Sequence, residues 1–138
     1  MSAKNWSDIS LERGYIDHKR PGQNAYYDYN LIQDWFQNLG LKFEVINRTT
    51  YTETIGWGYY SCTESDCTDT LISSIKSTYE FIMSEKNKAS KPHYNSLINP
   101  NFQIAGLGIT IDENNNRYFL TMHYATELTE SSSYNSCN

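Results

Sequence analysis

The chain has three histidines, and these are the side chains best suited to chemistry. His18 lies in a stretch punctuated by Pro21 and Gly22, His93 follows a proline, and His123 lies in an alternating segment late in the chain. Neutral imidazoles are good zinc ligands, and two of them leave coordination positions open to water or substrate. A carboxylate on the second ring nitrogen would orient each imidazole and raise its basicity. The spacing alone identifies no site, because no short motif such as His-Glu-x-x-His is present.

Other reaction classes find no support in the sequence. Ser84 lies near His93, but no Gly-x-Ser-x-Gly elbow presents a serine nucleophile. No glycine-rich phosphate loop is present, and the three cysteines do not form the paired pattern of a zinc knuckle. Cys62 and Cys67 are close enough for one small disulfide loop, which would leave Cys137 over.

The residues that could form a site also have simpler interpretations. His18 could be a solvated loop histidine, and His93 could open a short polar turn. Glu53 could be a half-exposed carboxylate at a strand edge. Glu85 could be a surface residue beside a lysine, although the C-terminus of a helix disfavours a negative charge.

Two further residues have alternative roles. Alternation places His123 on the same strand face as Thr121 and Ala125, which favours a structural role over a ligand role. Trp57 lies between two glycines and could form a cleft wall, or equally a core or loop anchor.

Hydrophobic periodicity predicts the elements that would position these side chains. Helices are expected over residues 3–16, 25–39 and about 67–86, and strands over residues 42–46, 102–111 and 116–124. Asp66 is the expected N-cap of the third helix. The apolar stripe expected on that helix consists of Leu71, Ile75, Tyr79 and Ile82. Residues 112–115, Asp-Glu-Asn-Asn, form a strong hairpin signal between the last two strands.

The length of 138 residues suits one domain, expected over residues 1–128, with a flexible tail at 129–138. The net charge of −5 and the lack of a Lys/Arg stripe argue against nucleic-acid binding. No apolar run reaches the roughly 20 residues of a membrane span, and the first residues do not form a signal peptide. Twelve tyrosines and two N-glycosylation patterns, at Asn5 and Asn47, favour an extracellular or cell-surface location.

Two parts of the chain carry a family resemblance. One is Thr52-Glu53-Thr54-Ile55, and the other is His93-Tyr94-Asn95-Ser96-Leu97-Ile98, which runs into Asn99-Pro100-Asn101-Phe102 and Gly106-Leu107-Gly108. They resemble the CAP family, the secreted domain shared by cysteine-rich secretory proteins, insect venom antigens and plant pathogenesis-related proteins. The later segments are most similar to the bacterial or archaeal short form. The resemblance covers roughly residues 3–125.

The resemblance implies an α+β fold, a three-layer α-β-α sandwich with a central antiparallel sheet. It also implies that His18, Glu53, Glu85 and His93 form a tetrad in one open cleft, with the two histidines as ligands of zinc or another divalent metal. The chain departs from the family in two places. Thr52 and Thr54 replace the glycine and asparagine that flank the acidic residue, and the family's first helix has no counterpart.

The expected function is a secreted or surface module that binds a small-molecule, peptide or protein ligand in a metal-capable cleft. The first alternative is a metal-dependent hydrolase, a peptidase or esterase, using the same residues. The second is lipid or sterol binding, for which the sequence shows no obvious apolar loop. A fold of this kind does not decide among these functions.

Overall fold

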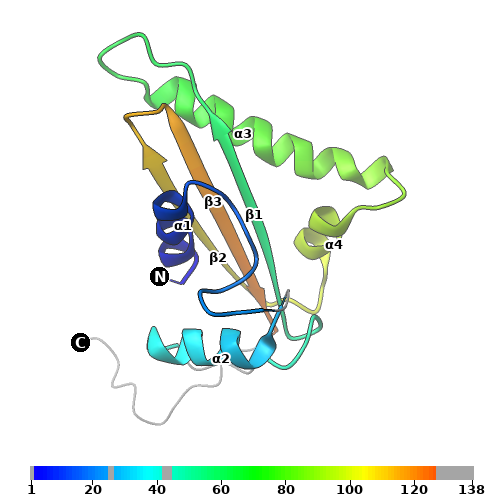
Figure 1. The fold of residues 1–138 in the computed structure, drawn as a ribbon. Helices are drawn as coiled ribbons and strands as arrows, with labels where there is room; N and C mark the ends of the chain where they lie inside the picture. The colour runs from blue at the N-terminus through cyan, green and yellow to red at the C-terminus, as the bar shows by residue number, and fades with distance from the viewer. Residues whose placement is uncertain (1, 25–26, 42–44, 127–138) are drawn as a thin grey trace, which may run out of the picture.

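The computed structural model describes residues 2–24, 27–41 and 45–126 of the chain. The fold is mixed α+β, with a three-stranded antiparallel sheet in the order β1-β3-β2 (Figure 1). The elements, in chain order, are α1 (Ser2–Arg13), α2 (Tyr29–Asn38), β1 (Tyr51–Tyr59), α3 (Thr68–Ser84), a short 3-10 helix (Glu85–Asn87), α4 (Pro92–Ile98), β2 (Ile104–Asp112) and β3 (Arg117–Ala125). Within the described part of the chain, no helix combines the length and the apolar character that crossing a membrane requires.

The hairpin of β2 and β3 confirms the two strands expected at residues 102–111 and 116–124. Asp112 organises the turn, because its carboxylate accepts hydrogen bonds from Asn115 and from Nε of Arg117 (2.7 Å). Asn116 has a φ of 49°, a left-handed conformation that asparagine tolerates better than most residues. β3 is the central strand and is buried along most of its length.

Helix α1 packs directly on β2 and β3. It was expected over residues 3–16 and ends at Arg13, because Gly14 takes a left-handed φ of 79°. The closest approach is at Gly108 of β2, where an added Cβ would lie 2.1 Å from the backbone nitrogen of Lys4. Ser7 Oγ donates a hydrogen bond to the Gly108 carbonyl at 3.0 Å. The missing side chain at Gly108 therefore lets the helix lie against the sheet.

Helix α2 covers the end of the sheet where β1 begins and β3 ends (Figure 1). It was expected over residues 25–39; it begins at Tyr29, where the Asp28 side chain caps the Leu31 N–H, and residues 25–26 lie outside the described part. The core cluster here consists of Ile32, Phe36, Val45, Tyr51 and Ala125. Of the strand expected over residues 42–46, residues 42–44 lie outside the described part, and the last two residues form no strand.

Helix α3 packs against β1 on the opposite face of the sheet from α1, and its expected apolar stripe is confirmed in part. Ile82 is buried and Leu71 and Ile75 are half-buried, but Tyr79 is 49% exposed. The contact with the sheet also uses polar groups: the Tyr118 hydroxyl bonds Thr78 Oγ1 at 2.6 Å and the Ser74 carbonyl at 2.8 Å. The hydrophobic pattern of α3 did not reveal this contact because hydroxyl groups make it.

The connection between β1 and α3 contains a disulfide between Cys62 and Cys67, with the Cα atoms 5.3 Å apart. Cys137 lies outside the described residues. Cys67 is the N-cap residue of α3, which corrects the assignment of that role to Asp66. The Asp66 carboxylate still accepts the Thr68 N–H at 2.9 Å, so it stabilises the same turn from one residue earlier.

Strand β1 was not predicted from the sequence, because Gly56 and Gly58 weaken a strand pattern. Their small size has a structural reason. A Cβ at Gly58 would lie 2.6 Å from the Tyr118 hydroxyl, and one at Gly56 would lie 3.3 Å from Cγ2 of Thr78. Gly58 therefore lets the Tyr118 side chain cross β1 and reach α3, and Gly56 lets Thr78 of α3 lie close to the strand.

Candidate functional site

Three residues of the expected tetrad, His18, Glu53 and His93, line one cavity of about 620 Å³. Glu85 is not among the lining residues and lies behind His93. The remaining lining residues are mainly polar: Tyr27, Arg48, Thr52, Pro92, Asn95, Ser96, Asn99 and Phe102. The four residues of the expected tetrad come from the loop after α1, from β1, from the short 3-10 helix after α3 and from α4. Elements far apart in sequence thus meet at this cavity.

Glu85 positions His93 through three hydrogen bonds. Its carboxylate accepts the backbone N–H groups of His93 (3.1 Å) and Tyr94 (3.2 Å), and Oε1 lies 2.7 Å from His93 Nδ1. Pro92 occupies the first turn of α4, and the carboxylate satisfies two N–H groups that a helix start leaves without partners. His93 therefore opens a helix, which corrects the short polar turn expected there.

The electrostatic effect on Glu85 has two opposing parts. Burial would raise the pKa of the carboxyl, but the hydrogen bonds from His93 and Tyr94 outweigh it and lower the pKa overall. The side chain is ionised at neutral pH. Glu85 follows the last turn of α3, where a negative charge is unfavourable, but it also precedes the first turn of α4, where a negative charge is favourable.

Glu53 holds His18 in the same way, with Oε1 lying 2.8 Å from Nδ1. The Glu53 side chain is buried, and Tyr27 borders the pair, with its ring stacked on the His18 imidazole at 5.2 Å between centroids. The Tyr27 hydroxyl donates to the Glu53 backbone carbonyl at 3.2 Å. His18 is therefore held on the cavity wall by a carboxylate and an aromatic ring.

Glu53 has further donors that the sequence analysis missed. Arg20 donates to both carboxylate oxygens (3.3 and 2.6 Å), Tyr51 Oη donates to Oε2 (3.1 Å), and His123 Nε2 lies 2.8 Å from the same oxygen. Burial would raise the pKa of the Glu53 carboxyl, but the charge of Arg20 and the hydrogen bonds from His123 and His18 hold it well below its usual range. Glu53 is thus an ionised, buried carboxylate surrounded by donors.

Arg20 is held by aromatic rings as well as by Glu53. Its guanidinium carbon lies 3.9 Å from the ring centroid of Trp6 and 4.4 Å from that of Trp35. These contacts join α1 and α2 to the cavity wall through one buried cation. Arg20 precedes a proline and a glycine, and this sequence context indicates a solvated loop residue. Only its three-dimensional contacts identify it as part of the site.

His123 has a structural role, in agreement with the sequence analysis. Its Nε2 contacts Glu53, and its Nδ1 lies 2.9 Å from Ser2 Oγ. Burial is the main cause that lowers the pKa of His123, which keeps the ring neutral. A neutral ring that donates from Nε2 to the carboxylate accepts the Ser2 hydroxyl hydrogen at Nδ1. Both ring nitrogens are therefore engaged, and His123 is not a candidate metal ligand.

The hydrogen bonds of the other two imidazoles indicate which ring nitrogen carries the proton. In the neutral form, His18 and His93 each place their ring proton on Nδ1, facing a carboxylate, so the lone pair is on Nε2. This arrangement is that of many metal-ligating histidines. Across residues 2–24, 27–41 and 45–126, however, no three His, Cys, Asp or Glu side chains are grouped as metal ligands. A metal here would rest on two protein ligands, with water completing its coordination.

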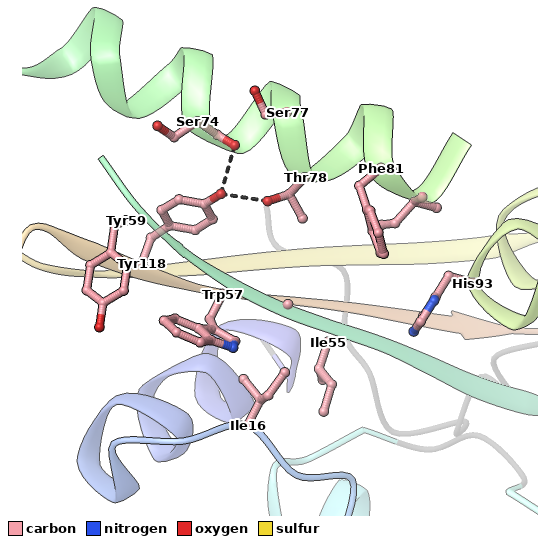
Figure 2. A pocket seen from close by; sticks show the side chains of 12 residues that line it. Ile16, Ile55, Trp57, Tyr59, Ser74, Ser77, Thr78, Phe81, His93 and Tyr118 are labelled. Atoms are coloured by element: carbon pink, nitrogen blue, oxygen red, sulfur yellow. Dashed lines mark hydrogen bonds between the residues drawn. The ribbon is translucent and has the colours of Figure 1, made fainter. Parts of the chain in front are cut away.

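A second groove, of about 470 Å³, begins at the other side of His93 and runs between β1 and α3 (Figure 2). Figure 2 shows Ile16, Ile55 and Trp57 on one side of β1 and Phe81 and Thr78 on the other. Trp57 is 48% exposed, so of the roles considered for it the cleft wall is the one it takes. His93 lines both spaces and joins them.

Comparisons with known proteins do not extend this description. The cavity has to be interpreted from its own hydrogen bonds and charges. No family model matches the chain, and no curated protein or solved structure matches it either.

Proposed function

We propose that this chain is a CAP-like, secreted or cell-surface binding module, and that its cavity holds zinc or another divalent metal on His18 and His93. One observation carries the proposal: two His–Glu pairs, each with Nδ1 on a carboxylate, have their imidazoles on the same cavity. Nε2 is the atom of each ring that would bind the metal. The three-layer sandwich belongs to the same proposal, and it is supported by the packing of α1 on β2 and β3 and of α3 on β1.

A bound metal would supply a Lewis-acid centre with positions open to a ligand. The chain's own residues would orient the two imidazoles, since Glu53 and Glu85 each hold one Nδ1. Asn95, Ser96 and Asn99 place further polar side chains on the wall. The proposal is binding rather than catalysis, because the carboxylates that could act as bases already accept hydrogen bonds from the protein.

Calorimetric zinc titration of the purified chain and its variants tests the metal site. We expect His93→Ala and His18→Ala to abolish measurable binding, and Glu85→Gln to weaken it about 10-fold or more by loosening His93. Asn95→Ala is the matched control, because Asn95 lines the same cavity without being a proposed ligand. His123→Ala is expected to lower stability and to retain zinc binding. Absence of zinc binding in the unmodified chain, or an equal loss in His93→Ala and His123→Ala, would contradict the assignment.

A further inference from the structure

Strand β1 is an edge strand of the described sheet. Its hydrogen bonds to β3 show which of its backbone groups point away from the sheet. Among the strands of residues 2–24, 27–41 and 45–126, the sheet order β1-β3-β2 gives β1 one neighbour, β3. Thr126 N–H donates to the Thr50 carbonyl at 3.1 Å, and Tyr60 N–H donates to the Asn116 carbonyl at 2.9 Å. Both backbone groups of a residue in an antiparallel strand point to the same side. The even-numbered residues of β1 therefore point toward β3, and the odd-numbered residues point away from it.

The contacts of Glu53 support this assignment independently. Its backbone carbonyl accepts a hydrogen bond from the Tyr27 hydroxyl, which approaches from the edge rather than from β3. Beyond Glu53 the edge carries the N–H and C=O groups of Ile55, Trp57 and Tyr59. In the part of the chain that the structure describes, none of these six groups has a hydrogen-bond partner. A row of unpaired donors and acceptors about 13 Å long remains.

This row lies in the groove between β1 and α3 (Figure 2). Ile16, Ile55 and Trp57 form one wall, and Phe81 and Thr78 form the other. Trp57 and Phe81 are 48% and 58% exposed, respectively. An extended strand at this edge would direct its side chains alternately to the two walls, because side chains alternate along a strand.

We propose that the groove binds an extended peptide segment that adds to the edge of β1 as a fourth strand. The backbone groups of Ile55, Trp57 and Tyr59 would pair with it, as in other cases of strand addition, and the aromatic walls would select its side chains. The inference rests on the proposed function, because it names a class of ligand for the binding module, in the groove that adjoins the cavity at His93. The peptide would run toward His93, which joins the groove to the metal-capable cavity.

The unpaired backbone groups of the groove favour a peptide over a lipid. The hydroxyls of Ser77 and Thr78, which also line it, already have partners within the protein, the Ser73 carbonyl and the Tyr118 hydroxyl. A lipid chain would bury the row of backbone groups along β1 without hydrogen bonds, at a cost in free energy, whereas a peptide backbone would satisfy them.

The probe is a linear dodecapeptide library displayed on phage and panned on the immobilised full chain, with Trp57→Ala as the counter-target. We expect selected peptides to bind the unmodified chain and to lose about 30-fold or more in affinity with Trp57→Ala, the loss typical of a buried aromatic anchor. Leu107→Ala is the matched control, because Leu107 is 62% exposed on β2, the other edge strand. This variant should bind as the unmodified chain does.

Two measurements test strand pairing itself. Methyl groups are placed on the backbone nitrogens of the selected peptide, one residue at a time. Methylation should abolish binding at every second residue and have little effect at the residues between them, since only alternate N–H groups of the peptide face β1. Hydrogen exchange by NMR should show new protection at the amides of Ile55, Trp57 and Tyr59. Uniform tolerance of N-methylation, protection elsewhere, dimerisation of the chain through the same amides, or failure to select any peptide would overturn the proposal.

The proposed metal site and the proposed peptide groove can be tested separately. His18→Ala should lose zinc and still bind the peptide, because His18 lines the cavity and not the groove. Trp57→Ala should lose the peptide and still bind zinc. Zinc binding without peptide binding would retain the proposed function and remove this inference, and the reverse result would retain the groove and remove the metal.

Discussion

Arg20 and Glu53 form a buried ion pair, in which Nη2 of the guanidinium lies 2.6 Å from Oε2 of the carboxylate. Both residues are less than 5% exposed. The pair stands between the tryptophan cluster of α1 and α2 and the imidazole of His18. The cavity that His18 and His93 line is thus connected to the core by a charge pair.

Removing one member of this pair should be costly. Arg20→Met leaves a buried carboxylate without its cation, and we expect the free energy of unfolding, measured in urea, to fall by about 3–5 kcal/mol. The double variant Arg20→Met/Glu53→Gln should lose less, because it removes both charges. Lys76→Ala is the control, since Lys76 and Glu80 form an exposed pair at 4.0 Å that should contribute less than about 1 kcal/mol. Equal losses in the single and double variants would show that charge is not the cause.

Acidification should destabilise the chain in two stages. His123 has a lowered pKa in the folded state, so its contribution is present above the unfolded value of about 6.5 and is lost as the pH falls. Glu53 also has a lowered pKa, so its contribution is present above about 4.3 and is lost as the pH falls through the folded value. Urea unfolding at a series of pH values should show a plateau above about pH 7 and decreasing stability below it. Greater stability at pH 4 than at pH 7 would contradict both assignments.

Two glycines of β2 should respond differently to the same substitution. Gly108→Ala places a methyl group against the backbone of α1, and we expect a loss of about 3 kcal/mol or more in the free energy of unfolding. Gly106→Ala meets nothing within 4 Å and should change stability by about 0.5 kcal/mol at most. Thermal unfolding of both variants provides the measurement. Similar effects at the two positions would argue against the close packing of α1.

The chain should fold without metal. Its core is built from apolar side chains such as Phe36 and Tyr51, and the proposed metal would bind at the wall of a cavity rather than inside this core. Circular dichroism should therefore be unchanged when EDTA is added at room temperature. A collapse of the helical signal on chelation, reversed by zinc, would make the metal structural.

We expect no robust hydrolysis of generic protease or esterase substrates, even with added zinc. Glu53 already accepts hydrogen bonds from Arg20, Tyr51 and two histidines, so it is poorly placed to take a proton from water. Fluorogenic peptide and ester assays provide the measurement. Turnover that disappears in both Glu53→Gln and His93→Ala would instead support the hydrolase alternative.

Local sequence signals predicted the parts of the fold that local physics decides. The turn at residues 112–115 and the end of α2, expected at residue 39 and followed by Gly40, follow from residues with particular backbone preferences. The expected end of α1 at residue 16 was three residues too late, because the left-handed Gly14 ends the helix at Arg13. β1 did not follow, because its glycines make room for residues distant in sequence, Tyr118 at Gly58 and Thr78 at Gly56. The start of α4 at Pro92 depends on a carboxylate seven residues earlier, which no local pattern contains.

The candidate site also contains residues that the sequence identifies and residues that only the three-dimensional contacts identify. Residue types and a family resemblance placed His18, Glu53, Glu85 and His93 in one cleft, with a carboxylate expected beside each histidine. The hydrogen bonds of the structure add which carboxylate holds which ring: Glu53 holds His18, and Glu85 holds His93. Arg20 could not be identified from the sequence, because its burial depends on Trp6 and Trp35. Its sequence neighbours alone indicate a solvated loop.

The disulfide between Cys62 and Cys67 has a mechanical consequence for the groove. It follows the end of β1 and precedes the first turn of α3, so it fastens together the elements that form the two walls. A covalent link at this end limits how far the two walls can separate there. We therefore expect any widening that admits a ligand to be larger at the other end of the groove, beside His93.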